Sequence, residues 1–377
     1  MRYRIILVSA AAIAFFGAVF TGALFYLSDL LLFPFKAREQ WMSVENITCT
    51  QWLKEYAYAD LREGFPSKKV LDLSCEDSLN LPAQSFYANS SRGERIHYKI
   101  YDNLSEEQKK SPQQLPLFFH VHGVSGTHMH GARYFKMASR LGFQLVAMDL
   151  SNHGLSDHNG LGASYGCREQ HDVIAVLNAL KAQFPNRKIL WHSTSMGTMA
   201  SLNAAGTLFP LEQKESEKTI LALALENPIP SVEQLVLSTP KKPNVPQGFI
   251  SLGVWLAEKR GKVDFSSCEP VKAAPKVSVP TYVYNSVHDD IVSPEVSNQV
   301  VAALPKENVF KVKVFTKGAH STVWNGNPED VEKDLAELWQ AASPVVPVSS
   351  ENQSPVLPPA SAGGNTPSTP VQPLISK

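Results

Sequence analysis

Trp191-His-Ser-Thr-Ser-Met-Gly-Thr198 decides the fold predicted for this chain, because it joins an apolar stretch directly to a run of small residues. The residues before Ser195 are expected to form a strand and those after it a helix. A serine held at such a tight turn needs small neighbours two positions before and after it, since both approach the adjoining backbone closely. Gly197 meets this requirement, and Ser193 stands where a glycine is usual.

Apolar stretches of strand length alternate with stretches of helical length on both sides of this turn. The predicted strands are 85–87, 95–101, 115–122, 144–148, 188–192, 219–225, 281–286 and 310–315, and the predicted helices are 134–141, 169–184, 195–207 and 249–259. Such alternation is typical of repeated βαβ units. The first two strands flank Asn89-Ser-Ser-Arg-Gly-Glu94, a polar hairpin turn. The predicted fold class is therefore α/β, with a mostly parallel central sheet flanked by helices.

Two later segments carry the groups that would activate a serine. Asp289 and Asp290 follow the predicted strand 281–286, and His320 follows the next strand. Serine, aspartate and histidine thus occur in the chain order that a nucleophile at a strand-to-helix turn requires. We expect Ser195 as the nucleophile, His320 as the general base and Asp289 as the carboxylate that orients the histidine. Asp290 is the alternative to Asp289.

Backbone N–H groups near Ser195 are candidates for an oxyanion hole. The strand 115–122 ends at His122-Gly123, and the first N–H of the loop that follows belongs to Val124. Met196 contributes an N–H at the start of the helix after Ser195, where the helix dipole also favours negative charge. The backbone N–H groups of Val124 and Met196 are therefore expected to hold the oxyanion of an attacked carbonyl.

Taken in order, these segments resemble the α/β-hydrolases, in particular the branch of monoacylglycerol lipases, lysophospholipases and serine aminopeptidases. The matching segments are His122-Gly123 with His128 and Tyr134, Gly142-Phe143, Asp149-Leu-Ser-Asn-His-Gly-Leu-Ser156, Ser195-Met-Gly197, Asp289-Asp-Ile-Val-Ser-Pro-Glu295 and Gly318-Ala-His320. Tyr165-Gly166, Glu169 and Asp172 also resemble a segment of related membrane-anchored bacterial hydrolases. The resemblance covers roughly 85–342 and implies the α/β-hydrolase fold and an acyl-enzyme on Ser195.

The resemblance also distinguishes the two aspartates, because the family's acid is followed three residues later by an aliphatic residue. Val292 stands in that relation to Asp289. The departures from the family pattern are Ser193 and Asn152 at positions usually occupied by glycine, and Asn285-Ser-Val in place of the usual His-Gly. None of them removes a catalytic atom, so they bear on substrate preference.

Residues 5–28 contain no charged side chain and are rich in Ala, Phe, Leu and Val. At about 1.5 Å per residue this run reaches about 36 Å as a helix, enough to cross a hydrocarbon core of about 30 Å. We expect 1–35 to be a single transmembrane anchor. A signal peptide cleaved near Thr21-Gly22-Ala23 is the alternative. Small residues recur every four positions along the run, which permits close packing of two helices, and the oligomeric state is left open.

Charges beside this run bear on its orientation. Two arginines among the first four residues favour a cytoplasmic N-terminus, which would place the catalytic domain on the extracytoplasmic side, although Lys36 and Arg38 weaken the argument. An extracytoplasmic compartment permits disulfides. Of the four cysteines, Cys49 and Cys75 are the pair expected first, and four buried free thiols are the alternative.

The remaining segments complete the domain plan. Residues 36–82 are expected to form a spacer with one short helix at 51–63, and 83–342 to form the hydrolase domain. Within that domain, 228–275 is less regular and is interpreted as a small lid. Residues 343–377 are rich in Pro and Ser, bury too little apolar surface to fold, and are expected to be disordered.

The composition excludes other classes of protein. Lys plus Arg and Asp plus Glu each number 35, so the chain has no basic field for a nucleic acid. His120, His122, His128 and His130 raise the alternative of a metal site, but no carboxylate or cysteine joins them at ligand spacing. No metal and no cofactor are expected.

The function expected from these observations is hydrolysis of carboxylic esters. A membrane tether would place the site beside lipid substrates, which favours lipid or monoacylglycerol-like esters. A serine peptidase acting on short peptides is the first alternative. The second is a membrane-anchored pseudo-hydrolase that keeps the fold without turnover. The presence of all three catalytic residue types argues against it.

Overall fold

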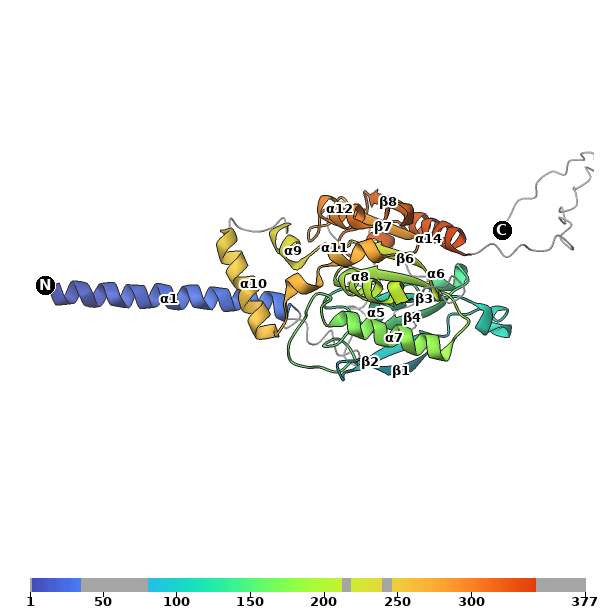
Figure 1. Ribbon diagram of the computed structural model, residues 1–377, viewed down its shortest axis with the longest axis horizontal. Coiled ribbons are helices and arrows are strands. Elements are labelled where there is room, and N and C mark those ends of the chain that lie inside the picture. The colour runs from blue at the N-terminus through green and yellow to red at the C-terminus, as the bar shows by residue number, and fades with distance from the viewer. Residues whose placement is uncertain (1, 35–80, 212–217, 239–245, 344–377) are drawn as a thin grey trace, which may run out of the picture. The chain divides into compact units, whose positions relative to one another are not determined.

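A computed structural model describes residues 2–34, 81–211, 218–238 and 246–343, with side chains described from residue 14 onward within these ranges. The described part contains an eight-stranded sheet in the order β1-β2-β4-β3-β5-β6-β7-β8 (Figure 1). The strands are β1 (Ala83–Asn89), β2 (Arg95–Tyr101), β3 (Leu117–Val121), β4 (Gln144–Met148), β5 (Ile189–Thr194), β6 (Ile220–Glu226), β7 (Thr281–Ser286) and β8 (Val309–Phe315). The pairs β1/β2 and β2/β4 are antiparallel, and all pairs from β4 to β8 are parallel. The predicted mostly parallel sheet is confirmed.

Helices connect the parallel strands. The α-helices are α1 (Arg2–Leu32), α5 (His128–Ala132), α6 (Phe135–Arg140), α7 (Glu169–Gln183), α8 (Met196–Leu208), α9 (Val232–Ser238), α10 (Gln247–Gly261), α11 (Pro270–Ala273), α12 (Pro294–Ala303), α13 (Val323–Gly326) and α14 (Pro328–Ala342). Short 3-10 helices are η4 (Gln108–Lys110), η5 (Pro112–Gln114), η6 (Phe209–Leu211), η8 (Phe265–Cys268), η9 (Ala274–Lys276) and η10 (Lys306–Asn308).

The sheet is covered on both faces. Every residue of β3, β5, β6 and β7 is buried, which is typical of central strands between two layers of helices. Because side chains alternate along a strand, Phe119 packs in the core cluster that includes α7 and α8, while Phe118 packs in the cluster that includes α6 and α14. Because these strands run parallel, their carboxyl ends lie at the same edge of the sheet.

The helices α5, α9, α11, α12, α13 and α14 were not predicted from the sequence. The helix α14 has a clear apolar stripe, because Val331, Leu335 and Leu338 are spaced four and three residues apart and are all buried. The predicted strand 188–192 also continues to Thr194, which pairs with Glu226 of β6. This extension carries the chain straight into the turn at Ser195.

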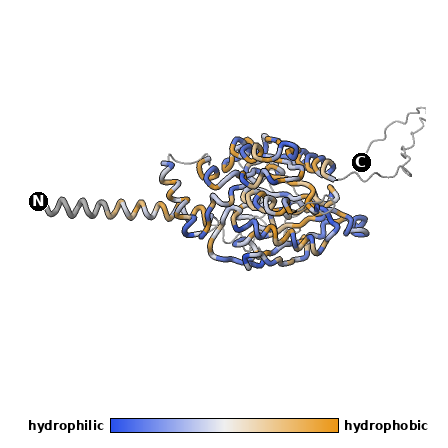
Figure 2. The backbone as a smooth tube through the Cα atoms, viewed as in Figure 1, coloured by the Kyte–Doolittle hydropathy of each residue, from blue (hydrophilic) through white to orange (hydrophobic). Residues whose placement is uncertain are grey.

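The helix α1 is long and apolar enough to cross a membrane over Ala14–Leu32, and it is the one such helix among the described residues. Figure 2 shows hydrophobic residues along this part of the helix. Phe15, Phe16 and Val19 are exposed, whereas Leu31 and Leu32 at its end are buried against the domain. A signal sequence and a single membrane anchor both fit this helix.

The end of α1 is fixed to the loop before α7. The N–H of Ala163 donates to the carbonyl of Leu32 at 2.7 Å, and the Tyr165 hydroxyl donates to the carbonyl of Leu31 at 3.0 Å. Gly162 has φ of 77°, and a Cβ there would lie 2.2 Å from the Leu32 carbonyl oxygen. Only glycine fits both the conformation and the close approach.

Cys167 and Cys268 form a disulfide, with Cα atoms 5.3 Å apart. It joins the loop before α7 to the end of η8, two places separated by 101 residues in the chain. The alternative of four buried free thiols is therefore wrong for these two cysteines. The expected pair of Cys49 and Cys75 and the helix at 51–63 lie outside the described residues. So do the spacer predicted at 36–82, apart from residues 81 and 82, and the tail predicted at 343–377, apart from residue 343.

Candidate active site

Ser195 lies at the turn between β5 and α8, with φ of 54° and ψ of −125°. A non-glycine residue in this conformation is strained, and such strain is common at reactive turns. Its N–H donates to the carbonyl of Glu226 at 3.0 Å, which holds the turn against β6. A Cβ on Gly197 would lie 2.5 Å from the backbone oxygens of Val121 and His122, so the turn requires glycine there.

Ser193, the departure from the family pattern, is accommodated by a partner on the next helix. Its hydroxyl lies 2.5 Å from the hydroxyl of Ser201 on α8, and both side chains are fully buried. The two hydroxyls satisfy each other, so the side chain is held by α8 without an unpaired polar group.

The structure brings Ser195, His320 and Asp289 into one hydrogen-bonded chain. The Nε2 atom of His320 lies 2.6 Å from the Ser195 Oγ, and its Nδ1 atom lies 2.8 Å from Asp289 Oδ2. Asp289 is 5% exposed and Ser195 is 4% exposed. This is the arrangement in which an imidazole removes the serine proton while a buried carboxylate holds its ring.

The carboxylate of Asp289 is itself held in place. Its Oδ1 atom accepts the N–H groups of Ile291 and Val292, each at 2.8 Å. Of the two adjacent aspartates, Asp289 is the one hydrogen-bonded to His320. The Nδ1 atom of His320 must therefore carry the hydrogen, which leaves Nε2 free to accept the proton of Ser195.

The pKa of His320 is raised above its ordinary value. Burial alone would lower it, but the charge and hydrogen bond of Asp289 and the charges of Glu226 and Asp290 outweigh that effect. A base must be neutral to accept the serine proton. Activity that depends on His320 is therefore expected to rise with pH through this raised pKa.

Glu226 and Arg133 lie beneath the His320 loop and were not identified from the sequence. Both side chains are buried, and Arg133 Nη2 lies 3.6 Å from Glu226 Oε2. Glu226 Oε1 accepts the N–H of Val323 at 2.8 Å, and Arg133 Nη1 donates to the carbonyl of Ser321 at 2.7 Å. The pair therefore holds the loop on both sides of Thr322, two residues after His320. No local motif marks two residues 93 positions apart, which explains why the sequence did not reveal them.

Glu226→Gln is expected to shift the acidic limb of the profile of kcat/KM against pH to lower pH. It removes a negative charge that raises the pKa of His320, so the imidazole becomes neutral at lower pH. The profile is measured on p-nitrophenyl acetate with rates normalised to the fraction of reactive serine. Glu329→Gln, which changes an exposed carboxylate on α14, is the control and should leave the limb in place. An unshifted limb in Glu226→Gln would show that this charge does not act on His320.

Val124 and Met196 are the residues expected to form the oxyanion hole; Met196 follows Ser195 in the chain, and Val124 follows Gly123. Gly123, next to Val124, approaches Ser195 so closely that a Cβ there would lie 2.9 Å from the Ser195 Cβ. The loop after Gly123 is closed by a hydrogen bond from the Gly126 N–H to the Gly123 carbonyl at 3.0 Å. Met196 is the first residue of α8. Their role as oxyanion donors stays a prediction.

The histidines considered as metal ligands have other partners. His122 accepts the Leu150 N–H at its Nε2 atom, and burial lowers its pKa to about 3, so it is neutral. The Nδ1 atoms of His120 and His192 lie 2.8 Å apart. Among the described residues, the one cluster with ligand atoms close enough for a metal is His97, His128 and Asp149, within 4.8 Å of one another.

That cluster is already hydrogen-bonded through the atoms that a metal would need. Both histidines approach Asp149 through Nδ1, at 2.8 and 2.9 Å, and the carboxylate also accepts the N–H groups of His128 and Leu155. Burial alone would raise the pKa of Asp149, but the two histidines hold it well below its usual range. The cluster therefore fits a structural anchor for the loop after β4.

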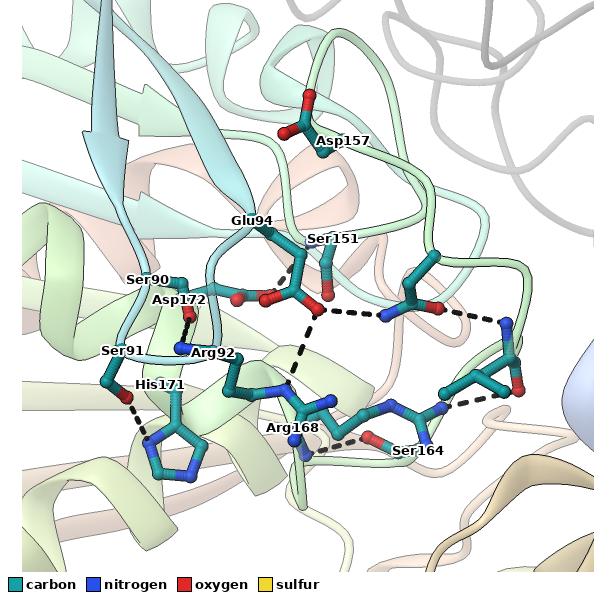
Figure 3. Close-up of polar contacts among 12 residues, drawn as sticks. Ser90, Ser91, Arg92, Glu94, Ser151, Asp157, Ser164, Arg168, His171 and Asp172 are labelled. Atoms are coloured by element: carbon teal, nitrogen blue, oxygen red, sulfur yellow. Dashed lines mark hydrogen bonds and ion pairs between the residues drawn. The ribbon is translucent and has the colours of Figure 1, made fainter.

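Asp172 is a second buried carboxyl group outside the Ser195 site. Figure 3 shows it among Ser90, Arg92, Glu94 and Ser151. Its Oδ2 atom accepts the Ser151 N–H at 2.9 Å, and burial raises its pKa to about 7, with further contributions from Glu169 and Glu94. The folded protein therefore keeps a proton on Asp172 at pH values where the unfolded chain has lost it.

Asp172→Asn is expected to change how stability depends on pH. Between the usual pKa of an aspartate and about 7, the folded native chain binds more protons at this site than the unfolded chain, so its stability falls as pH rises through that interval. Asparagine keeps an acceptor for Ser151 and does not titrate. Relative to the native chain, the variant should therefore gain stability from pH 5 to pH 8, by roughly 2 to 3 kcal/mol at about 1.4 kcal/mol per pKa unit.

Thermal unfolding midpoints at the two pH values check this, with Asp102→Asn as an exposed control. Parallel pH dependences of the native chain and Asp172→Asn would mean that Asp172 is ionised in the folded protein throughout.

Of the comparisons with known proteins, a solved structure with a TM-score above 0.5 agrees with this fold. The Hydrolase_4 family model, described as serine aminopeptidase S33, matches residues 118–257. No curated protein matches the chain. The esterase Pf2001 of Pyrococcus furiosus is similar in structure, with a TM-score of 0.52, 15% identity, and coverage of 74% of this chain and 99% of that chain. Est1E of Butyrivibrio proteoclasticus, solved with ferulic acid, gives a TM-score of 0.49, 15% identity and coverage of 68% and 98%.

A putative lipase of Acinetobacter baumannii gives a TM-score of 0.47, 15% identity and coverage of 72% and 97%. At 15% identity, the likeness to the Pyrococcus esterase establishes the fold and leaves the substrate open.

Proposed function

Because the chain belongs to the α/β-hydrolase superfamily, we propose that it is a serine hydrolase that cleaves carboxylic esters through an acyl-enzyme on Ser195. The observation that carries the proposal is the hydrogen-bonded chain from Ser195 through His320 to Asp289. The Pyrococcus protein of similar fold is described as an esterase, which supports an ester as the substrate class.

The mechanism follows from the positions of these groups. His320 Nε2 takes the proton of the Ser195 hydroxyl as the oxygen attacks the ester carbonyl. Asp289 keeps the ring oriented and stabilises its cation. The N–H groups of Val124 and Met196 hold the oxyanion. The imidazolium then protonates the leaving alcohol, and a water activated by the same imidazole releases the acid from Ser195.

We propose that α1 is retained as a membrane anchor within residues 1–35, with the hydrolase domain at 83–342 on the extracytoplasmic side. The disulfide between Cys167 and Cys268 supports an oxidising compartment. The burial of Leu31 and Leu32 in the domain supports retention of this end of the helix. In this assignment, residues 228–275 with α9 and α10 form a lid, and lipid esters are the favoured substrates.

A peptidase acting on short peptides is the second candidate, since the matching family model is described as a serine aminopeptidase. Peptide and ester hydrolysis share the same acyl-enzyme chemistry, so the residues around Ser195 do not separate them. The distinction comes from the groups that bind the rest of the substrate.

Labelling of the membrane fraction with a fluorophosphonate probe tests the proposal. The native chain should be labelled and Ser195→Ala should not, while Ser105→Ala, at an exposed serine outside the site, serves as the control. p-Nitrophenyl esters of increasing chain length and aminoacyl p-nitroanilides then separate an esterase from a peptidase. A folded native chain that is neither labelled nor active would instead support the pseudo-hydrolase.

A further inference from the structure

The helix α10 packs against α1 within the uncharged, apolar run of α1, residues 5–28. The rings of Phe20 and Phe249 are 5.3 Å apart, and a Cβ on Gly253 would lie 2.3 Å from a Leu27 methyl carbon. Phe20 precedes Asp29, the first charge after the run, by nine residues, which corresponds to about 13 Å along a helix. Figure 1 shows α10 crossing α1 near its C-terminal end.

The charged residues of α10 lie beside the charged end of α1, and its uncharged residues lie beside the uncharged run of α1. The eleven residues 247–257 carry no charge, and Glu258, Lys259 and Arg260 follow them. Arg260 donates to Ser28 Oγ at 2.9 Å and to Asp29 Oδ1 at 2.6 Å. The uncharged part of α10 therefore meets the uncharged part of α1, and the charged end of α10 meets the first charge of α1.

The exposed face of α10 carries two large apolar side chains, together with Ser251 and, near its charged end, Lys259. Ile250, Gly253 and Ala257 are buried on its inner face, whereas Leu252 is 37% exposed and Trp255 is 50% exposed. Exposed apolar side chains beside an apolar helix, with a tryptophan close to the charged end, are typical of a membrane–water interface.

We infer that the outer face of α10, formed by Leu252 and Trp255, is inserted into the lipid bilayer beside α1. The inference rests on the proposed role of α1 as a membrane anchor. If α1 spans the membrane, the contact between Phe20 and Phe249 places the N-terminal end of α10 below the surface, and the pair of Arg260 and Asp29 lies at the surface.

The insertion also places a groove beside the lipid. This groove lies in the segment between β6 and β7, residues 227–280. The groove, of about 240 Å³, lies between α9 and α10, lined by Val236, Leu237, Ile250, Val254 and Trp255 together with acidic residues. Trp255 lines this groove and is also exposed on the outer face. The rim of the groove at Trp255 therefore lies beside the lipid, while Glu233, Glu258 and Glu269 line other parts of the groove.

Fluorescence quenching tests the insertion. The full chain is reconstituted into vesicles of phosphatidylcholine and phosphatidylglycerol, with and without dibrominated phosphatidylcholine. The brominated lipid should quench a component of tryptophan emission that is lost in Trp255→Phe and kept in Trp339→Phe, a matched change in the partly buried tryptophan of α14. Quenching of Trp255 by aqueous acrylamide and not by the lipid would overturn the inference. So would protection from both quenchers, the result expected if a second copy of the chain covered this face.

A charge on the same face gives an independent readout. Leu252→Asp should lower hydrolysis of a long-chain ester held in vesicles by roughly tenfold, because an ionised side chain must leave the lipid. It should leave hydrolysis of soluble p-nitrophenyl acetate unchanged. Leu211→Asp, at an exposed leucine of η6, is the matched control and should change neither rate.

Fluorophosphonate labelling of the same samples separates this inference from the proposed reaction. Labelled protein whose Trp255 is not quenched by lipid rejects the insertion alone. Lipid quenching without labelling rejects the reaction and leaves the insertion standing. Protein that is extracted from membranes by alkaline carbonate while still labelled rejects the anchor and the insertion together, and leaves the hydrolase.

Discussion

Asp289→Asn is expected to lower kcat/KM for p-nitrophenyl butyrate by roughly 10³- to 10⁴-fold. The carboxylate holds the Nδ1 hydrogen of His320 and stabilises the imidazolium that forms when Ser195 loses its proton. An amide cannot neutralise that cation, and its NH₂ group can face Nδ1 only if the imidazole adopts the wrong tautomer. Measured rates should be referred to the folded fraction, since Asp289 also accepts two backbone N–H groups.

Asp290→Asn is the matched control, because it removes the same charge one residue further along the chain. It should retain kcat/KM within a few-fold, with a modest shift of the acidic limb to lower pH, since Asp290 also raises the pKa of His320. Equal losses in the two variants would show that the distance of 2.8 Å between Asp289 Oδ2 and His320 Nδ1 has no special role.

Ser195→Ala and His320→Ala are each expected to lower kcat by roughly 10⁵- to 10⁶-fold, and the double variant to lose no more than the poorer single variant. The serine hydroxyl is a weak nucleophile without its base, and the imidazole has nothing to activate without the hydroxyl. Two groups joined at 2.6 Å therefore act as one unit.

The double variant is compared with both single variants on the same ester under single-turnover conditions. Losses that multiply would show that Ser195 and His320 act independently, which would contradict the proposed mechanism. A native level of activity in Ser195→Ala would move the search for the nucleophile elsewhere.

The sequence predicted those parts of the fold that local patterns specify. The strands and the turn at Ser195 were predicted because an apolar run followed by small residues leaves few other conformations. The two aspartates at 289 and 290 were distinguished by the resemblance, and the structure places the first of them on His320. The structure thus brings together the three side chains expected at the site, and their catalytic roles stay predictions for the variants above to test.

Features that depend on residues distant in the chain were not predicted. Arg133 and Glu226 meet only because the turn between α5 and α6 lies close to β6 in the folded chain. The pairing of Cys167 with Cys268 depends on how the segment between β6 and β7 returns to α7, and cysteine spacing alone leaves three connectivities for four residues. The contact between α1 and α10 likewise joins elements more than 200 positions apart in the chain.

The disulfide between Cys167 and Cys268 also affects how the protein should be produced. Neither cysteine belongs to the hydrogen-bonded chain of Ser195, His320 and Asp289, so protein made in a reducing cytoplasm is expected to react normally with a fluorophosphonate. Such protein would nevertheless lack the covalent link that holds the end of η8 to the loop before α7. A cytoplasmic preparation would then report on the nucleophile. Screening for the natural substrate belongs with material folded in an oxidising compartment, because Cys268 lies in the segment 228–275 proposed as the lid.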